Sequence, residues 1–313
     1  MHDVFQNHPP SPIQEIWAEV LDQHAIELLV KRDDLLQPAG DDRFCGNKVR
    51  KLKYNLQAAR EAQQSQLLTF GGAYSNHIAA VARAGKRYGF RTVGVIRGEA
   101  HEPLNPTLAQ ATADGMHLHY LDRDTYRKKD QPEILRSLLD RFGASYVLPE
   151  GGTNELALRG CEELVTEIRQ QLGSLPDYLA VACGTGGTMA GIIRGCIRRS
   201  RVLGVSALKG NWMEKEIRRL LGQDDDLTNW QVFTDYHFGG YARFPPELRA
   251  FTREFEREHG IRLDPVYTCK LFYGILDLIG KGVFPKGSRI VVVHSGGLQG
   301  WNESMDQKLG LPR

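Results

Sequence analysis

The chain has 313 residues, with 40 basic and 38 acidic side chains and a formal net charge of +2. This near balance, without a long basic run, does not favour a nucleic-acid partner. No apolar stretch is long enough to span a bilayer, and the first residues lack the pattern of a secretory signal. The length predicts about two domains. Five scattered cysteines favour a reducing cytoplasm, and the scattered histidines do not predict a metal site.

Strand-like and helix-like segments alternate along most of the chain, with short glycine-bearing turns between them. This alternation is typical of an α/β fold with parallel sheets. In chain order, and after a first helix near residue 48, the sequence predicts strand 67–70, helix 76–88, strand 92–96, helix 107–113, strand 117–121, helix 133–142, strand 146–148, helix 155–172, strand 179–182, helix 189–199, strand 202–205 and strand 289–293.

The first predicted helix begins around Lys48, in the stretch Cys-Gly-Asn-Lys-Val-Arg-Lys-Leu. Gly46 allows a tight turn, Asn47 can cap the helix that begins there, and apolar residues recur at helical spacing from Val49. At a helix start the dipole disfavours a positive charge, which lowers the cost of the neutral amine that forms Schiff bases. Taken alone, this stretch is better explained as a solvated lysine in a basic run, so a chemical role depends on other segments.

Four glycine-rich turns follow predicted strands, which is where ligands bind in parallel sheets. The first opens a helix, and its amides, with Ser75 and Asn76, would point at an anion. Residues 182–188 present several amides and two hydroxyls, which suits a single phosphate, since the P-loop lysine and the dinucleotide fingerprint are both absent. We interpret residues 149–155 as the join between domains. Residues 294–297 follow the last strand.

Each turn also has a simpler interpretation as a plain turn. Ser75 with His77 would suggest a hydrolase, but the Gly-x-Ser-x-Gly elbow is absent. The combination is more specific: one lysine at a helix start, one loop for a single phosphate, several hydroxyl-bearing turns and no nucleotide or metal motif. A phosphate-bearing aldehyde held by a lysine is pyridoxal 5'-phosphate (PLP), which the sequence therefore predicts as cofactor.

Seven stretches together resemble the aminocyclopropane-carboxylate deaminase / D-cysteine desulfhydrase family of PLP enzymes, which has the tryptophan-synthase-β-like fold (fold type II). The resemblance implies an α/β protein of two domains, each an open, twisted, mostly parallel sheet flanked by helices. Residues 1–54 and 147–313 would form a large PLP-binding domain, with residues 55–146 as a small domain inserted in it. A homodimer is also implied. The stretches are 31–35, 46–52, 71–77, 150–155, 183–188, 264–268 and 294–297.

The same resemblance implies roles for individual residues. Lys48 would hold the cofactor covalently, and Asn76 would lie beside its ring hydroxyl. The cofactor phosphate would lie on the loop formed by Cys183, Gly184, Thr185, Gly186, Gly187 and Thr188. The substrate would contact Ser75, Asn76, His77, Tyr241 and Tyr267. The implied catalytic residues are Lys48, Ser75, Tyr241 and Tyr267.

Thr268 bears most directly on the reaction. The deaminases carry a glutamate at this position, paired with the pyridine nitrogen, which keeps that nitrogen protonated and the cofactor a strong electron sink. A neutral hydroxyl gives a weaker sink, which suits the loss of a thiolate from a β-carbon better than the opening of a cyclopropane ring. Ser295 is a rival for the same contact, because many relatives of this fold use a hydroxyl from that turn.

The sequence therefore predicts a PLP-dependent lyase that converts D-cysteine to pyruvate, ammonia and hydrogen sulfide by α,β-elimination. One alternative is 1-aminocyclopropane-1-carboxylate deamination to 2-oxobutanoate and ammonia. Others are racemisation or dehydration of a small amino acid, and a PLP-binding protein of weak activity. We expect a cytoplasmic homodimer that acts on a small amino acid, with neither nucleic acid nor membrane as partner.

Overall fold

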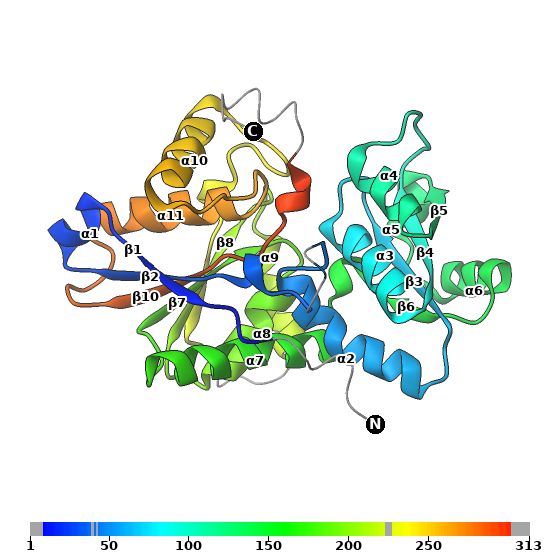
Figure 1. Ribbon diagram of the computed structural model, residues 1–313, viewed down its shortest axis with the longest axis horizontal. Coiled ribbons are helices and arrows are strands. Elements are labelled where there is room, and N and C mark those ends of the chain that lie inside the picture. Colours follow the sequence, from blue (N-terminus) through cyan, green and yellow to red (C-terminus); the bar gives the residue numbers. More distant parts are fainter. Residues whose placement is uncertain (1–8, 39–40, 42, 223–226, 302–313) are drawn as a thin grey trace.

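The computed structural model describes residues 9–38, 41, 43–222 and 227–301, which form two β-sheets flanked by helices (Figure 1). One sheet has six strands in the order β1-β2-β10-β7-β8-β9, and the other has four in the order β5-β4-β3-β6. The strands are β1 Ile13–Ile16, β2 Glu27–Lys31, β3 Gln66–Gly71, β4 Arg91–Arg97, β5 Met116–Leu121, β6 Tyr146–Leu148, β7 Tyr178–Cys183, β8 Arg201–Ser206, β9 Trp230–Phe233 and β10 Arg289–Val293. The helices are α1 Glu19–His24, α2 Asn47–Glu61, α3 Asn76–Tyr88, α4 Pro106–Ala113, α5 Arg123–Arg127, α6 Pro132–Phe142, α7 Glu155–Leu172, α8 Gly187–Cys196, α9 Trp212–Leu221, α10 Pro246–His259 and α11 Thr268–Gly280.

The six-stranded sheet is buried on both faces. Its strands pair in parallel except for β1, which runs antiparallel to β2 at one edge. Alternate residues of β10 serve opposite cores: Ile290 and Val292 face α10 and α11, while Val291 and Val293 face α7, α8 and α9. A strand that is covered on both faces has a continuous apolar sequence. The sequence pattern identified β10 for this reason.

The four-stranded sheet is entirely parallel. Helices α2, α3 and α4 pack on one face, and α5 and α6 cover the other. Helix α2 contacts both α7 and α3, so it runs from the large sheet's helical layer to the small sheet (Figure 1). The arrangement confirms the predicted α/β class with mostly parallel sheets.

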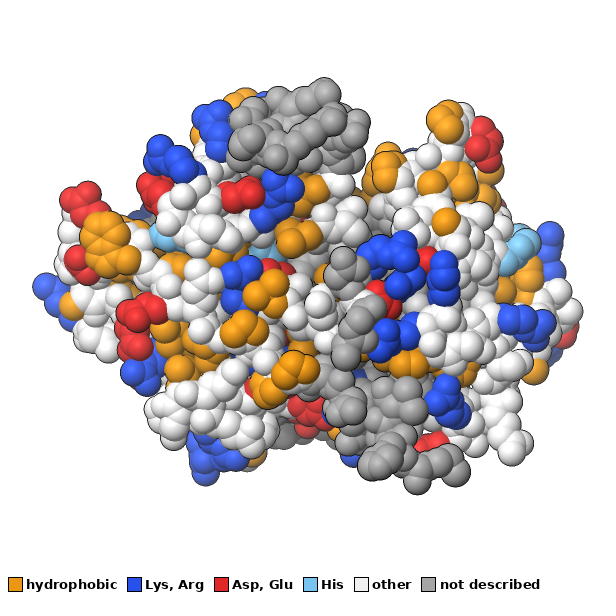
Figure 2. Space-filling model, in the orientation of Figure 1, with side chains coloured by type: hydrophobic (Ala, Val, Ile, Leu, Met, Phe, Trp, Pro, Cys, Tyr) orange, Lys and Arg blue, Asp and Glu red, His pale blue; other side chains and the backbone are white. Residues whose placement is uncertain are grey.

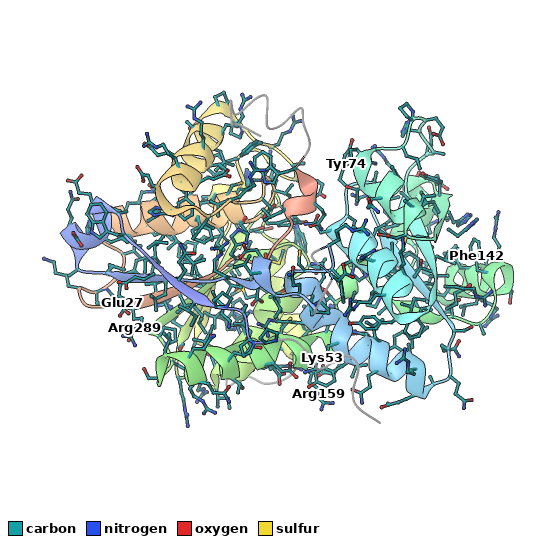
Figure 3. The ribbon with its side chains drawn as sticks, in the orientation of Figure 1. Glu27, Lys53, Tyr74, Phe142, Arg159 and Arg289 are labelled. Atoms are coloured by element: carbon teal, nitrogen blue, oxygen red, sulfur yellow. The ribbon has the colours of Figure 1, made fainter. Side chains whose placement is uncertain are left out.

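Ion pairs also join segments that are distant in the chain. Figure 3 shows Arg289 of β10 beside Glu27 of β2, where Nε lies 2.6 Å from the carboxylate. On the face shown in Figure 2, basic and acidic side chains are interspersed over both halves of the molecule. Within the described ranges, no helix has the length and apolar character that a bilayer crossing requires.

Every predicted strand is present within one residue of its predicted bounds. The predicted helices are also present, although the one predicted over residues 189–199 ends at Cys196, because Ile197 and Arg198 adopt positive φ. The sequence pattern missed β1, β2 and β9, and helices α1, α5, α9, α10 and α11. The missed strands are at most five residues long, too short for a clear period.

The two sheets draw on different parts of the chain. The small sheet uses strands between Gln66 and Leu148, and the large sheet uses the segments before and after it. On this basis we propose the division into a large domain of residues 1–54 and 147–313 and a small domain of 55–146. The boundaries at 54/55 and 146/147 fall inside α2 and β6, so the ends of those elements are better limits. The outer ends at 1 and 313 lie outside the described residues.

Candidate active site

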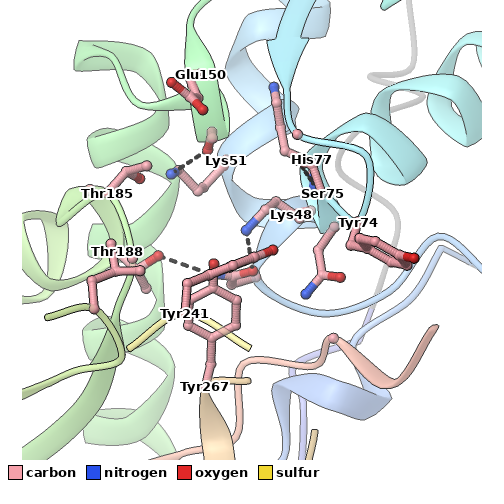
Figure 4. A pocket seen from close by; sticks show the side chains of 18 of the residues that line it. Lys48, Lys51, Tyr74, Ser75, His77, Glu150, Thr185, Thr188, Tyr241 and Tyr267 are labelled. Carbon is pink, nitrogen blue, oxygen red and sulfur yellow. Dashed lines mark hydrogen bonds between the residues drawn. The ribbon is translucent and has the colours of Figure 1, made fainter. Parts of the chain in front are cut away.

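A cavity of about 860 Å³ lies where the carboxyl ends of the strands in both sheets meet (Figure 4). The lining includes the turns after β3, β6, β7 and β10 and the first turn of α2, so the structure brings together the four turns that the sequence singled out. The lining includes twelve predicted site residues: Lys48, Ser75, Asn76, His77, Gly184, Thr185, Gly186, Gly187, Thr188, Tyr241, Tyr267 and Ser295.

Lys48 lies in the first turn of α2, with its amine in the middle of the cavity (Figure 4). The helix can begin there because Gly46 adopts φ +79°, and a Cβ on Gly46 would lie only 2.6 Å from the Ser295 carbonyl oxygen. Burial lowers the pKa of Lys48 to about 8, with Cys161 and Asp264 acting in the opposite direction. A substantial fraction of the amine is therefore neutral near pH 8, as a nucleophile requires.

Asn47 has a different role from the predicted one. The N-cap of α2 is Gly46, without a side-chain cap, and Asn47 is the first helical residue. Its amide nitrogen donates to Thr188 Oγ1 at 3.0 Å, and its Oδ1 accepts from Lys48 Nζ at 3.0 Å. The prediction that Asn47 caps the helix is wrong. The side chain instead ties the lysine to Thr188 in the first turn of α8.

The loop from β7 to α8 forms a narrow cradle. A Cβ on Gly187 would lie 2.7 Å from Thr153 Cγ2 and 3.1 Å from Lys51 Nζ, so only glycine fits there. The first amides of α8 have no acceptor within the helix, and the hydroxyls of Thr185 and Thr188 line the same space. Amides, hydroxyls and an amine around one small volume are the donor set of a phosphate site. The residues present therefore fit the phosphate of PLP.

Lys51 is a site residue that the sequence reasoning missed. Its Nζ donates to the Gly151 carbonyl at 2.6 Å and to Thr153 Oγ1 at 2.8 Å, beside the phosphate cradle. Burial, followed by the positive charge of Lys48, lowers the pKa of Lys51 to about 7. The available signal was its spacing: a residue three positions after Lys48 lies on the same helix face.

Ser75 and Asn76 lie at the N-terminus of α3. Ser75 caps this helix, because its Oγ accepts from the amides of His77 at 3.2 Å and Ile78 at 3.3 Å. Both acceptor positions of the hydroxyl are thus in use, so its own hydrogen remains to be donated into the cavity. Asn76 approaches the turn after β10, since a Cβ on Gly297 would lie 2.8 Å from its Nδ2.

His77 is a neutral, fixed ring at the wall of the cavity. Burial, aided by the charges of Lys48 and Lys51, lowers its pKa well below the usual value. Thr69 Oγ1 donates to the Leu148 carbonyl at 3.1 Å, so the 2.8 Å contact between Thr69 Oγ1 and His77 Nε2 requires Nε2 to be the donor. His77 Nδ1 is then a bare acceptor, and it has no partner among the described residues. The predicted contact of this side chain with a substrate carboxylate therefore lacks a donor.

Two tyrosines lie across the cavity from α3 (Figure 4). Their ring centroids are 6.3 Å apart at an interplanar angle of 66°. Tyr267 packs on the phosphate loop, because a Cβ on Gly184 would lie 3.0 Å from its ring. Burial raises the pKa of both Tyr241 and Tyr267, so each hydroxyl keeps its proton near neutrality and can donate it.

Two residues predicted to contact the cofactor lie outside the cavity lining. Cys183 is buried at the end of β7, with its sulfur 3.4 Å from that of Met189. Thr268 is fully buried, and its hydroxyl donates to Asp264 Oδ2 at 2.8 Å and accepts from the Asp264 amide at 2.7 Å. Of the two hydroxyls considered for the pyridine nitrogen, only that of Ser295 lines the cavity.

Across the part of the chain that the structure describes, no three His, Cys, Asp or Glu side chains gather as metal ligands would. Residues 4–296 match the family described as "Pyridoxal-phosphate dependent enzyme". The chain is therefore a member of the PLP-dependent enzymes, and PLP is its cofactor.

Individual relatives narrow this class. The chain is 31% identical over 312 residues to the "Putative 1-aminocyclopropane-1-carboxylate deaminase" of Pyrococcus horikoshii, covering 96% of this chain and 93% of that protein. It is 30% identical over 334 residues to the "Bifunctional D-cysteine desulfhydrase/1-aminocyclopropane-1-carboxylate deaminase, mitochondrial" of Arabidopsis thaliana, covering 99% and 82%. A crystal structure described as an "ACC deaminase homologue" superimposes with a TM-score of 0.82 at 30% identity, covering 97% and 94%. Within the PLP enzymes, the chain belongs to the family of these deaminases and desulfhydrases.

Proposed function

We propose that the protein catalyses α,β-elimination on a small amino acid, and that D-cysteine, converted to pyruvate, ammonia and hydrogen sulfide, is its best-supported substrate. Deamination of 1-aminocyclopropane-1-carboxylate is the alternative within the same site. A relative named for the deaminase reaction and a relative named for both reactions are about equally similar to this chain. The choice between the substrates therefore rests on the residues of the cavity.

Lys48 is the residue that we assign to the covalent link with the cofactor. When bound, PLP withdraws electrons from the Cα of an amino acid attached to its aldehyde carbon. We assign the removal of the substrate α-proton to the Lys48 Nζ, which would be free for it whenever it is not bonded to the cofactor. The pKa of about 8 supports both roles, because the amine is partly neutral at the pH of the cell.

The phosphate cradle and the N-terminus of α3 would fix the two ends of the reacting assembly. We assign the phosphate to the amides of residues 184–188, the hydroxyls of Thr185 and Thr188, and the amine of Lys51. We assign the substrate carboxylate to the Ser75 hydroxyl and the Asn76 side-chain amide, which lie at the positive end of α3. His77 keeps the loop in place through Thr69. We assign the donation of a proton to the departing side chain to Tyr241 and Tyr267, which line the cavity across from α3.

The observation that carries the choice of D-cysteine is the absence of a free carboxylate from the described cavity lining. Glu150 is the one acidic residue there, and it is paired with Lys129 at 3.2 Å. Ser295, at the end of β10, then offers the pyridine nitrogen a neutral hydroxyl. A neutral partner leaves less positive charge on the ring and a weaker pull on the Cα electrons. A thiolate departs with its own electron pair, so its loss needs less of this pull than the opening of a cyclopropane ring.

The test combines spectroscopy with two assays. Purified protein reconstituted with PLP should show an absorbance band in the visible, and Lys48→Ala should lose it, whereas the exposed Lys215→Ala should keep it. We expect sulfide release from D-cysteine with a higher kcat/KM than 2-oxobutanoate formation from 1-aminocyclopropane-1-carboxylate. The reverse order would establish the deaminase alternative. A stable band with no turnover of either compound would favour a binding protein of weak activity.

We also propose a cytoplasmic homodimer. The structure shows all five cysteines as free thiols, which is compatible with a reducing compartment. Light scattering of the purified protein at several concentrations tests the dimer, and a monomeric mass at all concentrations would refute it.

A further inference from the structure

One wall of the cavity carries polar side chains that the proposed reaction does not use. This wall belongs to the small sheet: Arg97 ends β4, Tyr126 lies on α5 and Lys129 follows it. Arg123 and Arg127 line the same part of the cavity. We call these five residues the cationic wall. Four of them are basic, although the phosphate cradle and Lys48 lie elsewhere in the cavity.

Arg97 lines the cavity with an exposed side chain. Its Nη2 lies 3.4 Å from the position of a Cβ on Gly72, at the start of the turn that leads to Ser75. Its Cζ lies 5.8 Å from the Tyr126 ring centroid, and its charge acts on the Tyr241 hydroxyl. The guanidinium therefore occupies the space between the substrate-facing turn and the tyrosine that flanks the substrate.

The cationic wall has more positive charge than the carboxylates around it neutralise. Arg127 pairs with Asp124 at 2.8 Å, and Lys129 pairs with Glu150 at 3.2 Å. No carboxylate in the described ranges pairs with Arg97 or with Arg123. Two guanidinium groups thus remain available to a ligand, and a guanidinium fits the planar face of an oxyacid with two parallel hydrogen bonds.

Tyr126 supplies an independent observation. Its side chain is 2% exposed and lines the cavity, and its Oη lies close to the Glu150 carboxylate without a well-formed hydrogen bond to it. A buried hydroxyl without a well-formed hydrogen bond calls for an explanation, because most such groups are satisfied. Burial, followed by the charge of Glu150 and the hydrogen-bonding contact with its carboxylate, raises the pKa of Tyr126 above its usual range, so the hydroxyl is protonated and is a donor. An anionic oxygen beside Arg97 would satisfy it.

We propose, on the basis of the proposed function, that the cationic wall is a subsite for an anionic oxyacid group on the substrate side chain. The substrate class is then an amino acid whose β-carbon carries a sulfate, sulfonate or phosphate group, which leaves with the electron pair of its bond to Cβ. For a sulfate ester of serine, the atoms and electrons of the elimination balance as follows. The Cα–H proton passes to Lys48 Nζ, its electron pair forms the Cα=Cβ bond, and the Cβ–O pair leaves with sulfate. One water then releases ammonia and pyruvate.

The experiment compares a charged and a neutral serine derivative on the PLP-loaded protein. Serine O-sulfate carries the anionic group and O-methylserine does not, and both enantiomers of each are titrated while the visible band is followed. We expect the sulfate to half-saturate the spectral change at a concentration at least about tenfold lower, as charge-assisted hydrogen bonds imply. Serine O-phosphate and aspartate, run in parallel, distinguish the kinds of oxyacid.

Arg97→Met should remove this preference, because KM for the sulfate ester should rise about tenfold more than KM for D-cysteine does. Arg97→Lys should restore part of it. Arg91→Met is the matched control, because Arg91 is an exposed arginine at the opposite end of the same strand and does not line the cavity. An equal loss for charged and neutral substrates in Arg97→Met would indicate a structural role and overturn the subsite.

The failures of the two proposals differ. If no amino acid changes the spectrum or turns over, the proposed elimination fails, and the subsite fails with it. If D-cysteine and O-methylserine respond but serine O-sulfate and its oxyacid analogues bind no better, the subsite alone is refuted and the proposed function stands.

Discussion

Replacement of Lys51 by Met tests the phosphate cradle most directly. The Lys51 ammonium has three N–H donors, and two of them are given to the Gly151 carbonyl and Thr153 Oγ1 at 2.6 and 2.8 Å. The third is free beside Gly187, where a Cβ would lie 3.1 Å from Nζ. Methionine has a similar length but no donor and no charge, so the change removes one charged contact with the phosphate.

A hydrogen bond from an ammonium to an anion contributes about 1.5 to 3 kcal/mol. We therefore expect Lys51→Met to weaken phosphate binding about 10- to 150-fold. The best probe is pyridoxine 5'-phosphate, which lacks the aldehyde and so reports the cradle without the covalent link to Lys48. Lys215→Met, at an exposed position on α9, is the charge-matched control and should leave the Kd unchanged.

The pH dependence gives a second measurement on the same variant. The pKa of Lys51 is lowered to about 7, so above that pH the amine of the free protein loses its proton. A phosphate dianion binds the protonated form better, and binding must then take up a proton. The Kd of the native protein should rise by up to about tenfold per unit between pH 7 and 9, because each proton is linked to binding. A Lys51→Met protein with the native Kd and the native pH slope would refute the assignment of Lys51 to the phosphate.

Three further changes test other parts of the structure. Gly46→Ala should lower the free energy of unfolding in urea by about 1 to 3 kcal/mol more than Gly89→Ala, because both glycines have positive φ but only at Gly46 would the methyl collide with backbone; equal losses would contradict this. Arg50→Met should cost about 3 to 5 kcal/mol in the same assay, since it leaves the buried Asp33 carboxylate without its cation and removes one of the two cations paired with Glu167, and a loss under about 1 kcal/mol would count against that pairing. Ser295→Ala should shift the visible band of the PLP-loaded protein, whereas Thr268→Val should lower stability without shifting it; the opposite result would return the pyridine contact to Thr268.

The sequence predicted the parts of the fold whose patterns are local. Residues of β10 and β3 are apolar on both faces, and α3 and α7 have regular apolar spacing, so their bounds could be read closely. Strand β2 was missed because only Leu28, Leu29 and Val30 form its apolar centre, between two charged residues. Its place beside β10 depends on pairing with residues near the other end of the chain, which no local pattern contains.

In the candidate site, too, the sequence predicted features with a local pattern and missed those that depend on three-dimensional contacts. Lys48 and the turns after the strands could be found because glycine and hydroxyl residues cluster where parallel strands end. The contact partner of Thr268 could not be predicted from the sequence. Its hydroxyl is held by Asp264, four residues earlier, and a sequence does not show the direction of a side chain at the start of a helix. The lowered pKa of Lys48 was predicted from the helix dipole. Its largest cause in the structure is burial, which depends on both sheets.

The first turns of three helices, α2, α3 and α8, all line the cavity, together with two lysines that are one helical turn apart. Positive helix ends and buried amines repel one another, so the arrangement is favourable only when an anion is bound. The phosphate would lie beside Lys51, and its negative charge would raise the pKa of that amine and keep it protonated. Lys48 has a neutral partner instead, Asn47 Oδ1, and burial lowers its pKa toward the neutral form. This supports our proposal that one helix presents a charged lysine to the phosphate and a neutral lysine for the reaction, because different loops complete the surroundings of each.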